Sequence, residues 1–420
     1  MAHIVKFEVD DLAANNRTIR KELDRHTNIF WGQNGCGKTS LLKILTSALA
    51  NDTSQLETVP FSSAKVYIHL FDEAPLLVKS ISKYASPEDA RENVPLEDQT
   101  IREYLKDIKR TNSERPQKKG GLDLKLRWFS QFEGRSDIDV EKIIGSGYTR
   151  HSYLPVSRIG GSRSPYSDGP PSALLHRLAR SGELDDSLLT EIFVFQINHV
   201  WERYTREALF SIRETQGEGL ASILALLFGD AERKDIAPPE AVTAPKAFEL
   251  VRNFLREQGI DLRVPESHFI KQFDSNESLQ MVVAEVLDVT KKVDTALRPQ
   301  KQFQAMIDSF YSGEKHVELP GRSDGHGSAN SSIRVMDGET RLDLELLSSG
   351  EKQLLQMMLE VLAASSESIL IDEPELSLHV DWQQRLVRTM RKLNPNCQLL
   401  LATHSPEIMA DIEDEFLHEL

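Results

Sequence analysis

The amino-acid sequence predicts an α/β fold with a mainly α-helical insertion, for three reasons. Near the start, a short apolar segment, Asn28–Trp31, is followed by a glycine-rich loop and an apolar-periodic helix. Near the end, the apolar residues Ile369–Ile371 run directly into two acidic residues. Between these ends, apolar residues recur at three- and four-residue spacings, the period of an amphipathic helix. Because 420 residues is long for one compact domain, we expect one large domain with an insertion, or two domains.

Two polar segments mark the expected boundaries of the insertion. Residues 159–171 are dense in Gly, Ser and Pro, and residues 321–332 form a second polar segment. We therefore predict an N-terminal lobe at residues 1–155, a helical insertion at residues 156–330 and a C-terminal lobe at residues 331–420.

Strand patterns dominate the N-terminal lobe. Residues 3–10 largely alternate, with Val5, Phe7 and Val9 on one side, which is typical of a half-buried strand. Further strands are predicted at residues 27–31, 65–71 and 76–78. Early antiparallel strands of this kind suggest a second sheet beside the one that carries the glycine-rich loop.

Helical periodicity dominates the middle of the chain. The segment 279–311 predicts a helical arm that Arg298-Pro299 should kink or break. No heptad pattern is sustained over many turns, so a long coiled coil is not expected. After the insertion, Asp337-Gly338-Glu339 between two strand patterns predicts a β-hairpin. The other helical segments are residues 173–178, 188–211, 219–228 and 245–259.

The glycine-rich loop matches the phosphate-binding pattern G-x-x-x-x-G-K-[ST], between a strand and a helix as the pattern requires. Its glycines let backbone N–H groups turn inward around a phosphate, at the positive end of the following helix. Lys38 is expected to contact the outer phosphates, and the Thr39 hydroxyl to hold Mg²⁺. The predicted nucleotide contacts are Gly32, Asn34, Gly35, Cys36, Gly37, Lys38, Thr39 and Ser40.

The acidic pair Asp372-Glu373 follows a segment with the pattern of a fully buried strand. In open α/β sheets, ligands lie at the carboxyl ends of the strands. We predict that Asp372 organises the Mg²⁺ shell and that Glu373 accepts the proton of the attacking water. A helix cap with a solvated neighbour is the alternative interpretation of the pair.

Two further segments are candidates for the same site. Leu347–Gln353 places Ser348, Ser349 and Gly350 at a helix start, where they can hold a γ-phosphate or form a plain N-cap with Glu351 in a capping box. Leu399–Pro406 is a buried strand with a polar tip that includes His404. The remaining histidines that we considered are interpreted as packing or surface residues: His151, His176, His199, His268 and His316.

Composition favours a cytoplasmic protein. Of the two cysteines, Cys36 lies in the phosphate loop, where a disulfide would block nucleotide, so a reducing compartment is expected. No secretory signal and no apolar run long enough for a bilayer occur, so no membrane partner is expected. The net charge of −15 disfavours a chain coated with nucleic acid, although residues 101–127 are basic. That basic run is either a solvated face or a DNA-binding patch.

Taken together, these motifs resemble those of ABC-type ATPases: the P-loop at 32–40, the signature at 347–351, Walker B at 369–373 and the switch histidine His404. The resemblance implies an ATPase head, with ATP and Mg²⁺ as cofactors and Lys38, Glu373 and His404 in catalysis. It also implies head-to-head dimers in which Ser348 and Gly350 act in trans. The segment 373–379 is similar to the EPE-x-x-LH segment of the OLD, SMC and DNA-repair branch. Departures are Ser349, Glu351 and the lack of a Q-loop glutamine near Tyr153–Arg158.

Within that branch, the chain is most similar to OLD-family ATPases. These commonly carry a C-terminal TOPRIM nuclease, for which the sixteen residues after His404 leave no room, and no HNH cluster occurs. We therefore expect a slow ATPase of an antiphage system that controls a separately encoded HNH or TOPRIM nuclease. This resembles the ATPase subunits PtuA of Septu and AriA of PARIS. The alternative is a DNA-repair or recombination ATPase that binds DNA through residues 101–127 and the Arg158 and Arg163 loop; a transporter head fits less well.

Overall fold

The structure, a computed structural model, divides into two compact units. It describes residues 2–70, 76–83, 126, 128–132, 151–155, 186–228, 242–257, 259–319, 332–365 and 367–420. The first unit comprises Met1–Ile192 and Ser348–Leu420, and the second comprises Phe193–Leu347. The three predicted domain ranges stay a prediction.

The first unit contains a five-stranded parallel sheet in the order β13-β3-β12-β11-β7. The sequence patterns predicted three of these strands, and the structure confirms them. The strands β7 and β13 were not predicted, because each has only three or four residues and neither carries a clear pattern. The bounds are β3 (Thr27–Trp31), β7 (His151–Leu154), β11 (Ser368–Asp372), β12 (Gln398–Thr403) and β13 (Leu417–Glu419).

A second, antiparallel sheet of the first unit has the order β2-β1-β4-β5-β6, which confirms the predicted sheet beside the parallel one. One detail differs from the alternation that the sequence suggests. A register shift between Ile4 and Lys6 moves Val5 out of phase, so that Ile4, Phe7 and Val9 are the buried residues. The bounds are β1 (His3–Asp10), β2 (Thr18–Glu22), β4 (Ser63–His69), β5 (Leu77–Ser82) and β6 (Phe129–Phe132).

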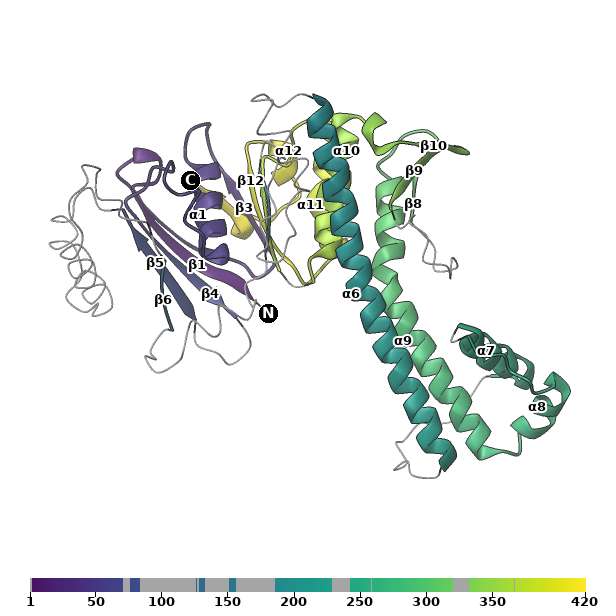
Figure 1. The fold of residues 1–420 in the computed structure, drawn as a ribbon. Helices are drawn as coiled ribbons and strands as arrows, with labels where there is room; N and C mark the ends of the chain where they lie inside the picture. The colour runs from purple at the N-terminus through teal and green to yellow at the C-terminus, as the bar shows by residue number, and fades with distance from the viewer. Residues whose placement is uncertain are drawn as a thin grey trace, which may run out of the picture. The chain divides into compact units, whose positions relative to one another are not determined.

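Helix α1 (Lys38–Ala50) packs between the two sheets and begins directly after the phosphate loop (Figure 1). Its buried Leu41, Leu42 and Leu45 belong to one core that also contains Phe7 of β1 and Phe30 of β3. Each such side chain contributes about 1.5–3 kcal/mol when fully buried. The phosphate loop is therefore attached directly to the hydrophobic core of the unit.

Four helices of the second unit share another core. Helices α6 (Asp186–Phe228) and α9 (Glu277–Asp308) lie side by side, and α7 (Ala244–Glu257) and α8 (Glu266–Phe273) pack against them (Figure 1). The sequence suggested two shorter helices where α6 is continuous. The structure contradicts a break at Pro299, since α9 continues through it, and the expected kink there stays a prediction. Buried Val293 and Phe303 hold the helix on both sides of the proline, and this packing offsets the one lost backbone hydrogen bond.

A three-stranded antiparallel sheet completes the second unit, in the order β10-β9-β8. Its strands are β8 (Lys315–Glu318), β9 (Arg334–Asp337) and β10 (Thr340–Leu342), so the predicted hairpin at residues 337–339 is confirmed. The predicted α/β fold, with an antiparallel β subdomain and a mainly α-helical insertion, is confirmed. In the described ranges, no helix has both the length and the apolar character needed to cross a membrane.

Candidate nucleotide site

The phosphate loop has the backbone shape that the sequence predicts. Gly35 and Gly37 lie in the left-handed region, at φ of 86° and 104°, where only glycine is unstrained. A side chain at Gly37 would also come within 2.9 Å of Leu12, which packs on the loop from the short 3-10 helix Leu12–Ala14. The ammonium of Lys38 is buried and donates hydrogen bonds to the carbonyls of Gly32, at 2.8 Å, and Gln33, at 3.3 Å.

The other predicted loop contacts lie in the same turn and at the start of α1. Asn34 and Gly35 are exposed, whereas Cys36, Thr39 and Ser40 are half-buried. Cys36, Thr39 and Ser40 thus lie at or next to the N-terminus of α1, the end of a helix that favours a phosphate, and their contacts with nucleotide stay predictions.

Asp372 lies at the carboxyl end of β11 and is completely buried. Burial raises the pKa of its carboxyl group to about 6, although the nearby Thr39 hydroxyl lowers the pKa. Within the described part of the chain, neither carboxylate oxygen has a partner at hydrogen-bonding geometry. An unpartnered buried carboxylate beside a hydroxyl is a set of hard oxygen donors, so Asp372 and Thr39 fit a Mg²⁺ ion.

Glu373 begins the loop after β11 and has a left-handed backbone, with φ of 47°. Its N–H donates to the carbonyl of Ala402 on β12, at 2.8 Å. The adjacent strand β12 ends at His404, whose Nδ1 lies 3.6 Å from Glu373 Oε1. The expectation that the histidine lies near the acidic strand is confirmed; the catalytic roles of both residues stay predictions.

Glu375 was not among the residues predicted for the site. Its Oε1 lies 3.2 Å from His404 Nδ1 and accepts hydrogen bonds from Thr403 and from the backbone N–H groups of His404 and Ser405. The signal that points to it in the sequence is the third acid in Asp372-Glu373-Pro374-Glu375, an unusual residue to bury so close to two other carboxylates.

The signature segment forms the start of α10 (Ser349–Ala363), with Ser348 as the N-cap. Ser348 N donates to Glu351 Oε2 at 2.8 Å, and Glu351 N donates to Ser348 Oγ at 3.3 Å. The capping-box alternative is therefore present in the structure, and the exposed Ser348 still faces solvent. Gly350 is required for packing, because a Cβ there would lie 2.5 Å from the carbonyl of Ser377. The predicted contacts of Ser348 and Gly350 with nucleotide stay predictions.

Comparison with known families agrees with this geometry. The profile of the family described as "AAA domain, putative AbiEii toxin, Type IV TA system" matches residues 125–410, more than half of the chain. The chain belongs to this family. A second profile, described as "AAA domain", matches residues 6–144 of the chain.

Two curated relatives of the chain are named as retron ATPases. The chain is 25% identical over 167 residues to the "Retron Vc95 probable ATPase" of Vibrio cholerae serotype O1 biovar El Tor. This alignment covers 35% of the chain and 31% of the relative. The chain is 32% identical over 82 residues to the "Retron Ec83 probable ATPase" of Escherichia coli. This alignment covers 16% of the chain and 15% of the relative. The chain thus spans less than a third of the length of these relatives.

Among solved structures, the head domain of Smc from Pyrococcus furiosus, bound to the C-terminal domain of ScpA, aligns with a TM-score of 0.43 and 12% identity. That alignment covers 98% of this chain and 92% of the other. The family matches show an AAA domain, which agrees with the predicted P-loop ATPase class. The narrower resemblance to PtuA or AriA stays a prediction.

A cavity of about 580 Å³ adjoins the phosphate loop. Gly32, Gln33 and Cys36 line one side of it, and the basic residues Arg17 and Lys21 of the β1–β2 hairpin region line another. Ligand pockets in proteins typically enclose about 300–1,000 Å³, so this cavity is large enough for the base and ribose of a nucleotide.

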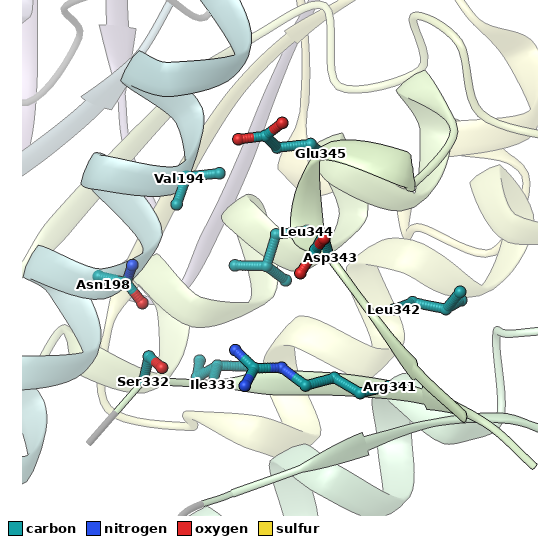
Figure 2. A pocket seen from close by; sticks show the side chains of 9 residues that line it. All are labelled: Val194, Asn198, Ser332, Ile333, Arg341, Leu342, Asp343, Leu344 and Glu345. Carbon is teal, nitrogen blue, oxygen red and sulfur yellow. The ribbon is translucent and has the colours of Figure 1, made fainter. Parts of the chain in front are cut away.

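The second unit contains a smaller cavity of about 130 Å³, lined by Asn198, Arg341 and Asp343 among others (Figure 2). Asn198 Oδ1 is buried there without a hydrogen-bond partner in the described chain. Its volume falls below the usual range for ligand pockets, so we do not assign the nucleotide to it.

Several predictions fall outside the described residues or find no support among them. The basic run at 101–127 lies almost entirely outside them, as do Arg158, Arg163 and His176. At the expected Q-loop position, β7 instead places Tyr153, whose pKa is raised by burial and by the Asp372 carboxylate. No cluster of His, Cys, Asp and Glu suited to a further metal ion occurs among the residues that the structure describes.

Proposed function

We propose that this AAA-domain ATPase binds Mg·ATP and hydrolyses it slowly. The single observation that carries the proposal is the buried, unpartnered carboxylate of Asp372 beside the Thr39 hydroxyl, next to a phosphate loop built around Lys38. Such a carboxylate is costly in a folded protein unless a cation binds to it. A loop that binds phosphate and a carboxylate that needs a cation are the two halves of a Mg·nucleotide site.

In this site the chain's residues have separate tasks. The Lys38 ammonium exchanges its two loop carbonyls for phosphate oxygens, and the N–H groups of the loop bind the same phosphates. Thr39 and Asp372 would hold Mg²⁺, which would supply positive charge to the phosphates. Glu373 accepts the proton of the attacking water, and the cavity lined by Arg17 and Lys21 receives the base and ribose.

We also propose that two copies assemble head to head around ATP. Support comes from Ser348, which is exposed at the N-terminus of α10, where its hydroxyl and neighbouring N–H groups suit an anion. In the dimer, Ser348 and Gly350 of one copy contact the γ-phosphate bound by the P-loop of the other.

The biological setting that we propose is an antiphage complex. The names of the two retron-associated probable ATPases support this setting. The complex contains a separately encoded nuclease of HNH or TOPRIM type, which ATP-dependent assembly restrains or licenses. Direct DNA binding by a repair ATPase is the alternative, and a complex held by DNA contacts would dissociate steeply with salt.

Titration calorimetry with Mg·ATP and a phosphate-release assay test the nucleotide site. Lys38→Ala should abolish ATP binding, and Glu373→Gln should bind ATP but hydrolyse it at least about tenfold more slowly. Normal ATP affinity in the Lys38 variant would remove the P-loop assignment, and unimpaired turnover in the Glu373 variant would mean another base.

Light scattering tests the dimer. ATP should shift the Glu373→Gln protein from monomer to dimer, and Ser348→Arg should prevent that shift without loss of ATP binding. Ser275→Arg, at an exposed serine in the second unit, is the matched control. Intact ATP-dependent assembly in the Ser348 variant would rule out the trans arrangement.

A further inference from the structure

One carboxylate oxygen in the first unit accepts three hydrogen bonds and also lies close to a histidine ring nitrogen. Glu375 Oε1 accepts from Thr403 Oγ1 at 2.7 Å, from His404 N at 2.9 Å and from Ser405 N at 3.2 Å. The ring Nδ1 of His404 lies 3.2 Å from the same oxygen. The Glu375 side chain is only 5% exposed, so these contacts are made away from water, where charge-assisted hydrogen bonds are strongest.

This contact selects a protonation pattern for His404. An ionised carboxylate oxygen can only accept, so Nδ1 must carry a proton to bond to it. In neutral imidazole the other nitrogen, Nε2, is then an acceptor and is the ring atom left for a ligand or water. The His404 side chain is 47% exposed, so its ring is accessible from solvent while its Nδ1 edge is held by Glu375.

Glu375 lies closer to the ring than the proposed general base does. Nδ1 is 3.2 Å from Glu375 Oε1 but 3.6 Å from Glu373 Oε1, and the longer distance exceeds that of a hydrogen bond. The Nδ1 proton is therefore directed to Glu375.

The backbone around Glu375 is held from two sides. Gln353 of α10 donates to the carbonyl of Pro374 at 2.8 Å, and Leu378 N donates to the Glu375 carbonyl at 3.0 Å. Gln383 of α11 (Val380–Leu393) accepts from the Ser405 hydroxyl at 2.7 Å. These contacts fix the Glu375 carboxylate relative to the end of β12.

We propose that Glu375 is a positioning residue that fixes the tautomer and orientation of His404 at the nucleotide site. The expected effect of Glu375 on kcat rests on the proposed ATPase function. The expected tautomer of His404 does not depend on that function. Many metal-binding and catalytic histidines are arranged in the same way: a carboxylate bonded to one ring nitrogen determines whether the other nitrogen accepts or donates.

The first test reads the tautomer directly. Protein labelled with ¹⁵N-histidine is studied by NMR at a pH of about 8.5, where free imidazole is neutral. The His404 signal is identified by its loss in His404→Gln. We expect the Nδ1–H form in the wild type and in Glu375→Gln, whose amide oxygen still accepts, and a shift toward Nε2–H in Glu375→Ala. A wild-type His404 in the Nε2–H form would overturn the proposal, and this result does not depend on whether Glu375→Ala folds.

The second test separates kcat from KM for ATP. Glu375→Ala should lower kcat at least about tenfold with little change in KM, and Glu375→Gln should recover most of that loss. In a His404→Ala background, Glu375→Ala should lower kcat by less than about a further twofold, because the two residues act as one unit. Equal losses in both backgrounds, or a matching loss of ATP affinity, would indicate a purely structural role and contradict the proposal.

Glu407→Gln is the matched control. Glu407 is two residues beyond Ser405 and accepts from Gln384 Nε2 at 2.7 Å, so the same substitution there changes a similar hydrogen bond at the surface. It should leave the His404 tautomer and kcat unchanged. If the wild type shows the Nδ1–H form but hydrolyses no ATP, the proposed function fails while the positioning role of Glu375 is supported.

Discussion

The ammonium group of Lys79, on β5, donates a hydrogen bond of 2.6 Å to the carbonyl of Ala48 in the last turn of α1. Lys79 is completely buried, and burial lowers its pKa from 10.5 to about 8. The lysine thus joins the antiparallel sheet to the carboxyl end of the helix whose other end holds the phosphate loop. A cation suits that end of a helix, because the last carbonyls carry partial negative charge.

Stability should therefore depend on Lys79 in alkaline solution. Between pH 8 and 10.5 the unfolded chain binds this proton more strongly than the folded chain, so the lysine's contribution to the free energy of unfolding rises with pH. We compare the free energies of unfolding of the wild type and of Lys79→Met. The wild-type free energy minus that of the variant should increase by about 1.4 kcal/mol per pH unit between pH 8 and 10.5. Urea denaturation at pH 7.5, 8.5 and 9.5 measures it, and a flat difference would contradict the buried-ammonium assignment.

Asp372→Asn should stabilise the protein without nucleotide. The raised pKa of about 6 means that the ionised carboxylate costs about 2–3 kcal/mol at neutral pH, and asparagine removes that charge. The same variant should lose the increase in melting temperature that Mg·ATP gives the wild type. Differential scanning fluorimetry with EDTA, with Mg²⁺ and with Mg·ATP distinguishes the two effects. A less stable variant that still responds to Mg·ATP would count against a cation at Asp372.

Two glycines of α6 should respond in opposite ways to the same substitution. At Gly219 a Cβ would lie 2.2 Å from Val289 Cγ2 of α9, whereas at Gly217 nothing lies within 4 Å. Gly217→Ala should raise the free energy of unfolding of this unit by about 0.5–1 kcal/mol through helix propensity. Gly219→Ala should lower it by about 1–3 kcal/mol through overpacking. Equal effects in denaturation followed by circular dichroism would show that α6 and α9 do not pack closely at this point.

The two cysteines should differ in reactivity. Cys36 is half-buried in the phosphate loop, whereas Cys397 is fully buried and burial raises its pKa to about 11. Maleimide should modify Cys36 alone, prevent ATP binding and be slowed by saturating ATP. Cys36→Ser should keep its nucleotide affinity after the same treatment. Mass spectrometry locates the adduct, and modification of Cys397 in the native protein would contradict the described burial.

The sequence predicts best where one pattern persists over many residues or carries a motif. This condition is met by the P-loop, by the buried acidic strand and by the strand before His404. The sequence therefore predicted all three segments. By contrast, β13 has only three residues, and its contacts with the neighbouring strand β3 hold it in place. One of these contacts is the hydrogen bond of 3.0 Å between the buried His418 ring and Asn28 Oδ1. Such tertiary contacts leave no periodic trace in the sequence.

Two other differences have similar causes. Glu375, which the sequence did not predict for the site, is identified by three hydrogen bonds from a strand end almost thirty residues later in the chain and by the nearby His404 ring. Pro299 lies inside α9 because packing on either side outweighs a local preference that sequence patterns weigh heavily. Both the site residue and the continuous helix are decided by long-range contacts.

The strand order places β3, which carries the phosphate loop, between β12 and β13. During synthesis, residues 27–31 therefore leave the ribosome more than three hundred residues before either neighbour exists. Closing so long a loop is entropically costly and slows folding. The parallel sheet on both sides of β3 is thus completed late in folding, only after residues 398–419 have been made.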